Sequence, residues 1–216
     1  MNIPQIHLMK LRPLALYSLT LLLCSCAATS VKTTSKSPDS RGPVGKIAVL
    51  AIDHRREVRQ GFENRFVSQL ASGGAAAVKT FDQLSLAEIK ADKLAAAEHF
   101  RASGAEAVLI LRLAGRTSTY REVRPGHERY AGVTTGYDSM GWYDYYSVGF
   151  MDMSPTYGNL KEKVNLEASL YDLKTEKRLW SAVTQTVVTE NMDRVAEMDP
   201  VVEKIVAAMR KDGVIR

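Results

Sequence analysis

Cysteine is almost absent from this chain of 216 residues, and its two cysteines, Cys24 and Cys26, stand close together near the start. No thiol is therefore available further along for a disulfide or a thiolate metal site. Long apolar runs are missing as well. The longest, from Pro13 to Leu23, is shorter than the roughly 20 residues that a membrane-spanning helix needs. The chain after residue 26 must hold its core by packing alone.

Motifs of catalysis and of cofactor binding are also missing. The sequence contains no G-x-S-x-G elbow, no Walker loop and no G-x-G-x-x-G. The histidines after residue 26 (His54, His99 and His127) lie in different segments without metal-ligand spacing. The pair Asp53-His54 follows an expected strand, where α/β folds place functional side chains, but a helix N-cap beside a solvated histidine explains it more simply. We therefore expect no catalytic, cofactor or metal site, and a protein that is not an enzyme.

Charge of either sign is not concentrated. The chain has 29 basic and 24 acidic residues, for a net charge of +5, and loss of Lys10 and Arg12 with the first 25 residues would leave +3. A nucleic-acid partner is not expected, because the basic face that would bind phosphates is missing. Carboxylates such as Glu162 and Glu167 fall on expected strand surfaces, where solvated charge is the usual state.

Residues 1–25 have the layout of a secretory signal. Lys10 and Arg12 precede the apolar run, and no acidic residue occurs among them. The residues Leu23-Cys24-Ser25-Cys26 resemble the bacterial lipobox, in which a leucine stands three positions before the lipidated cysteine and a small residue directly precedes it. The resemblance implies cleavage before Cys26 and acylation of its sulfur. The alternative is an ordinary signal peptide with two incidental cysteines.

The acylated cysteine would hold the protein on a membrane. Two or three acyl chains make such an anchor effectively permanent, whereas one chain binds only marginally. Ala27 follows the anchor, and in the enteric sorting pattern this resembles a lipoprotein of the outer membrane facing the periplasm. Residues 26–45 are expected to be the lipidated cysteine and a flexible tether, because Ser, Thr, Lys and Pro dominate and little can be buried. A coil of this length spans roughly 25 Å.

Residues 46–216 are expected to form a single α/β (α+β) domain with a mixed sheet. Two apolar runs, residues 46–52 and 107–114, are typical of strands buried on both faces. Between them lie a helix with apolar residues every four positions from 58 to 70, a short strand at 75–80 and a helical region at 84–102. The resulting order of strand, helix, strand, helix, strand favours partly parallel pairing.

The C-terminal part predicts a hairpin and a helix. Apolar and polar residues alternate from Val164 to Tyr171, and a second such segment, residues 178–188, follows a turn at 172–177. Asp199 as N-cap and Pro200 at the first helical position then begin a helix that Gly213 ends.

A tyrosine-rich insertion, residues 124–160, separates the two halves. It holds six of the nine tyrosines, and long loops of this kind are uncommon in compact domains. Three interpretations stay open: a structural excursion that covers one face of the sheet, a binding surface, or a hairpin that touches membrane or forms oligomers. The candidate interaction residues are Tyr130, Tyr137, Trp142, Tyr143, Tyr145, Tyr146 and Phe150.

The segment LEASLYDLKTEKRLWSA, residues 166–182, resembles a domain-of-unknown-function family of bacterial envelope lipoproteins. That family has a Leu-Tyr-Asp strand end, a Lys-Thr turn and an early tryptophan in the next strand. Tyr171 and Trp180 flank the turn, so we expect them to pack near one another. More distantly, the element order is similar to that of lipoproteins that activate peptidoglycan synthases and of the curli secretion channel subunit.

These patterns together predict a membrane-anchored, non-enzymatic interaction or accessory module of the cell envelope. Its partners would be the membrane, through the lipid, and an envelope protein not identified by the sequence. The alternatives are an oligomeric secretion or pore subunit of the outer membrane and an envelope hydrolase with an unrecognised site. The oligomeric state does not follow from the residues.

Overall fold

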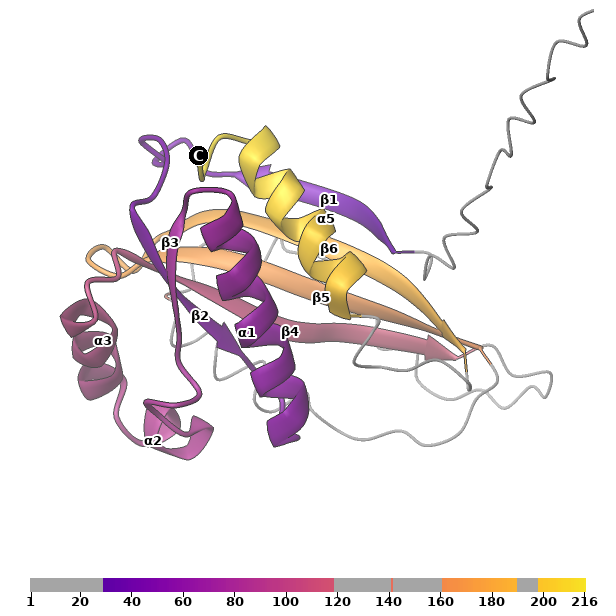
Figure 1. Cartoon of the computed structure of the whole chain (residues 1–216), viewed down its shortest axis with the longest axis horizontal. Coiled ribbons are helices and arrows are strands. Elements are labelled where there is room, and N and C mark those ends of the chain that lie inside the picture. The colour runs from indigo at the N-terminus through magenta and orange to yellow at the C-terminus, as the bar shows by residue number, and fades with distance from the viewer. Residues whose placement is uncertain (1–28, 119–140, 142–160, 190–197) are drawn as a thin grey trace, which may run out of the picture.

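A six-stranded mixed sheet forms the centre of the computed structural model, which describes residues 29–118, 141, 161–189 and 198–216 (Figure 1). The strand order is β1-β6-β5-β4-β2-β3. Strands β3, β2 and β4 are parallel to one another, and β4, β5, β6 and β1 pair antiparallel. The elements are β1 (Ser30–Lys36), β2 (Lys46–Ala51), α1 (Arg56–Ser72), β3 (Ala76–Lys79), α2 (Leu86–Ala91), α3 (Lys93–Ala102), β4 (Ala107–Ser118), β5 (Lys161–Asp172), β6 (Arg178–Thr189) and α5 (Met198–Lys211).

This architecture confirms the expected α/β class with a mixed sheet, a hairpin and a C-terminal helix. The two apolar runs form β2 and β4, which are adjacent and parallel, with Ile47 opposite Ala107. Parallel strands need crossovers on the faces of the sheet: α1 connects β2 to β3 on one face, and α2 and α3 connect β3 to β4 on the other. Both strands are therefore buried on both faces, as their uninterrupted apolar sequences predict.

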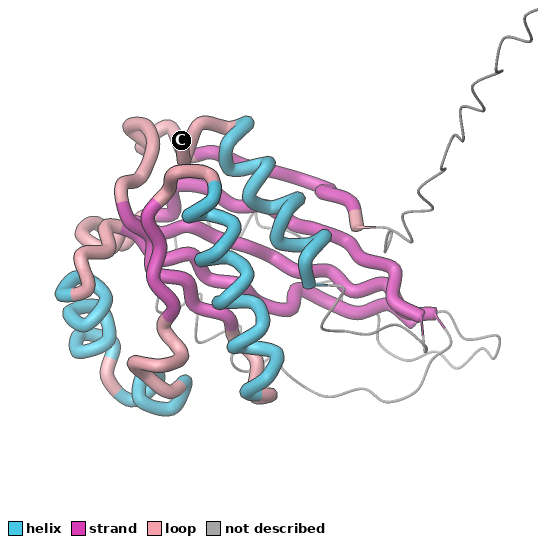
Figure 2. The backbone as a smooth tube through the Cα atoms, viewed as in Figure 1, coloured by secondary structure: helices cyan, strands magenta, loops and turns pink. Residues whose placement is uncertain are grey.

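Helices cover the two faces of the sheet unequally. On one face, α1 and α5 lie side by side along the strands, as Figure 2 shows, and pack on a core that includes Phe66, Leu109, Trp180 and Val206. On the other face, α2 and α3 cover a second core built on β2, β4 and the end of β5, with Phe100 fully buried. The described helices of this second face lie over the parallel part of the sheet.

The expected flexible tether is wrong for residues 30–36. These residues form β1, which pairs antiparallel with β6 and places Lys36 opposite Trp180. Most of its side chains are exposed, so its stability comes from the ladder of backbone hydrogen bonds along the edge of the sheet. The segment from residue 27 to residue 45 is therefore not one continuous coil.

Two further expectations need correction. The helical region at 84–102 divides into α2 and α3 because Asp92 is extended, ends the first helix and caps the second by accepting a hydrogen bond from the Ala95 backbone N–H. Tyr171 and Trp180 do not pack together, because Leu170 lies opposite Trp180 and Tyr171, the next residue of β5, points to the other face of the sheet. The two aromatic side chains consequently lie in different cores, on opposite faces of the sheet.

Four strand ends meet at one end of the sheet. The end of β4 pairs with the start of β5 at Ser118 and Glu162, and Lys161 pairs with Thr189 at the end of β6. The start of β1 joins them, since Ser30 lies opposite Gln185. We call this the insertion end, because the chain leaves β4 and enters β5 here on either side of the tyrosine-rich insertion (Figure 1).

Candidate functional site

An apolar pocket lies near the insertion end, between the sheet and the first turns of α1 and α5. Its volume is about 120 Å³, and its walls include Val58 and Phe62 of α1, Met198 and Val201 of α5, and residues of β2, β4, β5 and β6. Strand alternation explains the composition, because Leu111, Leu166 and Thr186 all face α1 and α5. We call this space the anchor-side pocket.

A β-bulge places a cation in the pocket wall. The ladder between β4 and β5 shifts between Leu113 and Gly115, so Arg116 comes to lie opposite Val164. Arg116 therefore lies on the face of α1 and α5, although regular alternation from Leu113 would have placed it on the other face. Its guanidinium adds positive charge to walls that are otherwise mostly apolar.

A second polar group lines the pocket where β2 ends. The Asp53 carboxylate accepts hydrogen bonds from the Arg55 backbone N–H at 2.9 Å and from the Arg55 guanidinium at 2.9 and 2.7 Å. This ion pair raises the pKa of Arg55. The expected N-cap role of Asp53 is wrong, because Arg55 occupies the N-cap position of α1 and no side chain caps it. His54, beside this pair, is exposed.

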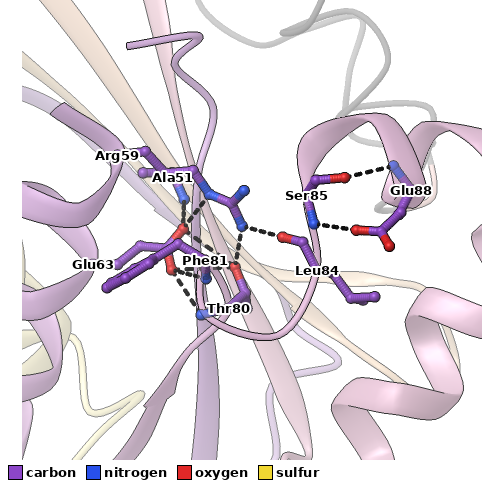
Figure 3. Close-up of polar contacts among 8 residues, drawn as sticks. All are labelled: Ala51, Arg59, Glu63, Thr80, Phe81, Leu84, Ser85 and Glu88. Atoms are coloured by element: carbon purple, nitrogen blue, oxygen red, sulfur yellow. Dashed lines mark hydrogen bonds and ion pairs between the residues drawn. The ribbon is translucent and has the colours of Figure 1, made fainter. Parts of the chain in front are cut away.

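A buried carboxyl group holds the backbone beside the pocket (Figure 3). Glu63 of α1 is fully buried and accepts hydrogen bonds from the backbone N–H groups of Ala51, Thr80 and Phe81, at 3.2, 2.7 and 2.7 Å. These three groups lie at the carboxyl ends of the parallel strands β2 and β3, where the ladder no longer satisfies them. Glu63 thereby ties α1 to both strand ends.

Arg59 completes this network from the preceding turn of α1. Its guanidinium donates to Glu63 at 2.8 Å through Nε, and through Nη2 to the Thr80 hydroxyl at 3.1 Å and the Leu84 carbonyl at 2.9 Å. Burial raises the pKa of Glu63, while Arg59 and the backbone N–H groups of Phe81 and Ala51 oppose that rise. Because these groups bond to one another and to the backbone at the ends of β2 and β3, we assign the network a positioning role for Ala51, which lines the pocket.

Arg112 and Glu167 form a second buried ion pair, on the opposite face of the sheet. They lie directly opposite one another on β4 and β5, with 2.6 Å between Nη2 and Oε2, and each side chain is 1% exposed. The expectation that Glu167 is a solvated surface carboxylate is therefore wrong. The alternating pattern correctly places Glu167 on the face of its strand away from the apolar residues. The sequence alone does not indicate that this face is covered. The side chain of Glu162 lies outside the described residues.

The residues singled out in the sequence lie mostly outside the described part of the chain. This holds for Cys26 and for every candidate interaction residue of the insertion, including Trp142 and the Tyr-Asp-Tyr-Tyr segment after it. The pocket and the Glu63 network were not predicted. A signal for the network existed in Arg59 and Glu63, which are spaced i,i+4 on the buried side of α1, but this spacing also occurs on solvated helices.

Within the described residues, no group of three or more His, Cys, Asp or Glu side chains is arranged to hold a metal ion. Likewise, among the helices that the structure describes, none is long and apolar enough to cross a membrane. Chemically, the described site offers a small apolar space with polar groups at its edge.

No protein-family model matches the chain, and no curated protein sequence matches it. Among solved structures, a PelC dodecamer from Paraburkholderia phytofirmans has a TM-score of 0.47 and 13% identity, covering 87% of this chain and 99% of that one. Lipoprotein GNA1162 from Neisseria meningitidis has a TM-score of 0.40 and 16% identity, covering 77% and 96%. At this level the similarities assign no family and no function to the chain.

Proposed function

We propose that this protein is a membrane-anchored accessory lipoprotein of the cell envelope that presents its tyrosine-rich insertion to a partner protein at the membrane surface. Acylated Cys26 is the anchor, and the domain acts by contact rather than by catalysis. The outer membrane, on its periplasmic side, is the proposed location, since Ala27 follows the anchor. The proposed contact residues are the seven aromatic residues of the insertion named from the sequence.

The position of β1 is the observation that carries this proposal. Thr29, directly before β1, shares a hydrogen bond of 2.9 Å with Thr186 at the insertion end. Cys26 precedes Thr29 by three residues, a distance of at most about 10 Å for an extended chain. A lipid on Cys26 would therefore keep the insertion end close to the bilayer.

The insertion begins and ends at that same end of the sheet. Ser118 and Lys161, the last residue of β4 and the first of β5, lie where β6 finishes and β1 starts. Aromatic side chains presented there would meet a partner at the membrane surface, and Tyr and Trp give large contact areas with a polar tip. This supports a contact function more directly than the apolar pocket supports catalysis.

Photo-crosslinking in living cells tests the proposal. A photoreactive amino acid replaces Tyr143 or Tyr145 in the full chain, and a control replaces Leu94, which is 69% exposed on α3. We expect the two insertion positions to capture a defined envelope protein and Leu94 to capture none. The Cys26→Ala form should lose both the capture and its place in the membrane pellet. Equal capture from all three positions would contradict a contact surface on the insertion.

The same experiment separates the alternatives. Adducts between two copies of this chain, together with rings in detergent, would favour an oligomeric secretion or pore subunit. Mass spectrometry of the N-terminal peptide checks the anchor independently, because an unmodified Cys26 sulfur would refute the lipoprotein assignment.

A further inference from the structure

The anchor-side pocket opens next to the point where the N-terminal segment reaches the sheet. Thr186 lines the pocket, and the same hydroxyl bonds to Thr29. Because only two residues separate Thr29 from Cys26, the proposed site of acylation stays within about 10 Å of Thr29 in any conformation of the backbone. The lipid-bearing sulfur is thus confined to the neighbourhood of an apolar space.

We propose that one acyl chain of Cys26 folds back and occupies the anchor-side pocket. This inference rests on the proposed acylation and goes beyond it by assigning the chain a binding site in its own protein. Several wall residues are only partly buried, among them Val58, Phe62, Leu113, Val164 and Val188. An aliphatic chain placed against them removes apolar surface of both partners from water, which is favourable in proportion to the area covered.

The size of the pocket limits the occupant to part of one chain. Its volume of about 120 Å³ is comparable to an engineered apolar cavity of roughly 150 Å³ that binds benzene. Several methylene groups fit such a space, whereas two or three complete chains do not. The remaining acyl chains would stay in the bilayer and keep the protein anchored, because stable anchoring takes more than one chain.

Occupancy of the pocket would fix the orientation of the domain. The pocket lies between the insertion end of the sheet and the first turns of α1 and α5, so a chain held there ties this side of the molecule to the lipid. The tyrosine-rich insertion would then face the membrane surface in one orientation rather than rotating about a free anchor.

A photoreactive fatty acid tests this placement. Cells that make the full chain are grown with a diazirine-bearing fatty acid, and the acylated protein is purified in detergent and irradiated. We expect intramolecular adducts between the Cys26 lipid and peptides of β4 and β6 that contain Leu113 and Val188. Acylated Cys26 with adducts only to detergent would overturn the inference while leaving the proposed function intact. An unacylated Cys26 would instead overturn the proposed function.

Two neighbouring substitutions provide a matched pair. Val188→Arg introduces a charge into the pocket wall, whereas Val187→Arg introduces the same charge one residue earlier, on the opposite face of β6. Val188→Arg should abolish the β4 and β6 adducts, and Val187→Arg should retain them. Equal adduct yields from the two variants, each checked for native circular dichroism, would contradict the assignment.

A second measurement does not depend on either variant. The unlipidated Cys26→Ala chain, purified from the soluble fraction, is exposed to the free diazirine fatty acid and irradiated. Its β4 and β6 peptides should be labelled, and those of the acylated chain should be protected because the pocket is already filled. Equal labelling of both forms would show that the lipid of Cys26 lies elsewhere.

Discussion

Removing the Glu63 side chain should be among the most destabilising single changes in this protein. Glu63→Ala deletes the acceptor shared by Ala51, Thr80 and Phe81, whose N–H groups lie at the ends of β2 and β3. It also removes the carboxylate that pairs with the Arg59 guanidinium. Arg59 is buried, with 6% of its surface exposed. Two costs therefore arise together: orphaned backbone donors and an uncompensated buried charge.

The magnitude can be worked out from these two costs. Breaking a buried ion pair by removing one partner costs about 3–5 kcal/mol, and a buried donor without an acceptor costs about 1–3 kcal/mol. Relaxation and water entry reduce the sum, so we expect a loss of about 5 kcal/mol in the free energy of unfolding. For a domain whose total stability is about 5–15 kcal/mol, such a loss approaches unfolding.

A double variant distinguishes this network from an ordinary buried ion pair. Arg59→Met with Glu63→Leu removes both charges. Proteins often tolerate such a double change when the two charged groups bond only to each other. Here the three backbone N–H groups would still lack an acceptor, so the double variant should remain destabilised by about 3 kcal/mol. Glu63→Gln keeps one carbonyl oxygen and should lose less than Glu63→Ala.

Urea unfolding of the Cys26→Ala form, followed by far-ultraviolet circular dichroism, measures these free energies. Glu57→Ala is the matched control, because Glu57 is an exposed glutamate in the first turn of the same helix. It should cost less than about 1 kcal/mol. A Glu63→Ala loss no larger than that of the control, or a double variant as stable as the parent, would refute the assigned role.

Three further predictions concern other contacts. Glu167→Ala should lower the free energy of unfolding by about 3–5 kcal/mol because it breaks the buried ion pair with Arg112, and an unchanged urea midpoint would contradict this. Ser85 holds the pKa of Glu88 below its ordinary value of 4.5, so the capping box stabilises α2 above that pH and weakens as pH falls further. Glu88→Gln should flatten this acid dependence of the unfolding midpoint, and an unchanged slope would contradict it. Trp180→Phe should lower the free energy of unfolding by about 2 kcal/mol in the same assay, because the Asp212 carboxylate loses its hydrogen bond of 2.8 Å from the indole N–H. An unchanged free energy of unfolding would contradict this prediction.

The central strands could be predicted because the sequence of each strand shows whether one or both of its faces are buried. Buried parallel strands need apolar residues at every position, and the hairpin strands need them at alternate positions, so β2, β4, β5 and β6 each carry a recognisable pattern. Gly213, with φ of 66°, ends the last helix as its position predicted. These signals depend only on neighbouring residues.

β1 could not be predicted in the same way, because its sequence, SVKTTSK, offers almost nothing to bury. Composition measures whether a segment can form a core, and an edge strand does not need to form one. It needs free backbone hydrogen-bonding groups on a neighbouring strand, and β6 provides them from about 150 residues away. Threonine and valine favour extended backbone, but this preference is too weak to outweigh the polar composition.

The candidate site escaped prediction for a related reason. Its polar groups come from elements that are far apart in the sequence. Glu63 accepts a hydrogen bond from the Thr80 backbone, and Arg116 enters the pocket wall only because of a bulge after Leu113. A bulge shifts every later side chain of its strand to the other face, so strict alternation misplaces the residues beyond it.

The strand that replaces the expected tether changes what an anchor can do. A coil of 19 residues would let the domain drift roughly 25 Å from the membrane and would leave its orientation free. With Thr29 fixed to Thr186, the link from Cys26 is only three residues long, and any lipid there acts on one defined end of the sheet. The insertion, the four strand ends and the anchor-side pocket lie at or near that end, so the proposed anchor, contact surface and acyl site all depend on the pairing of β1 with β6.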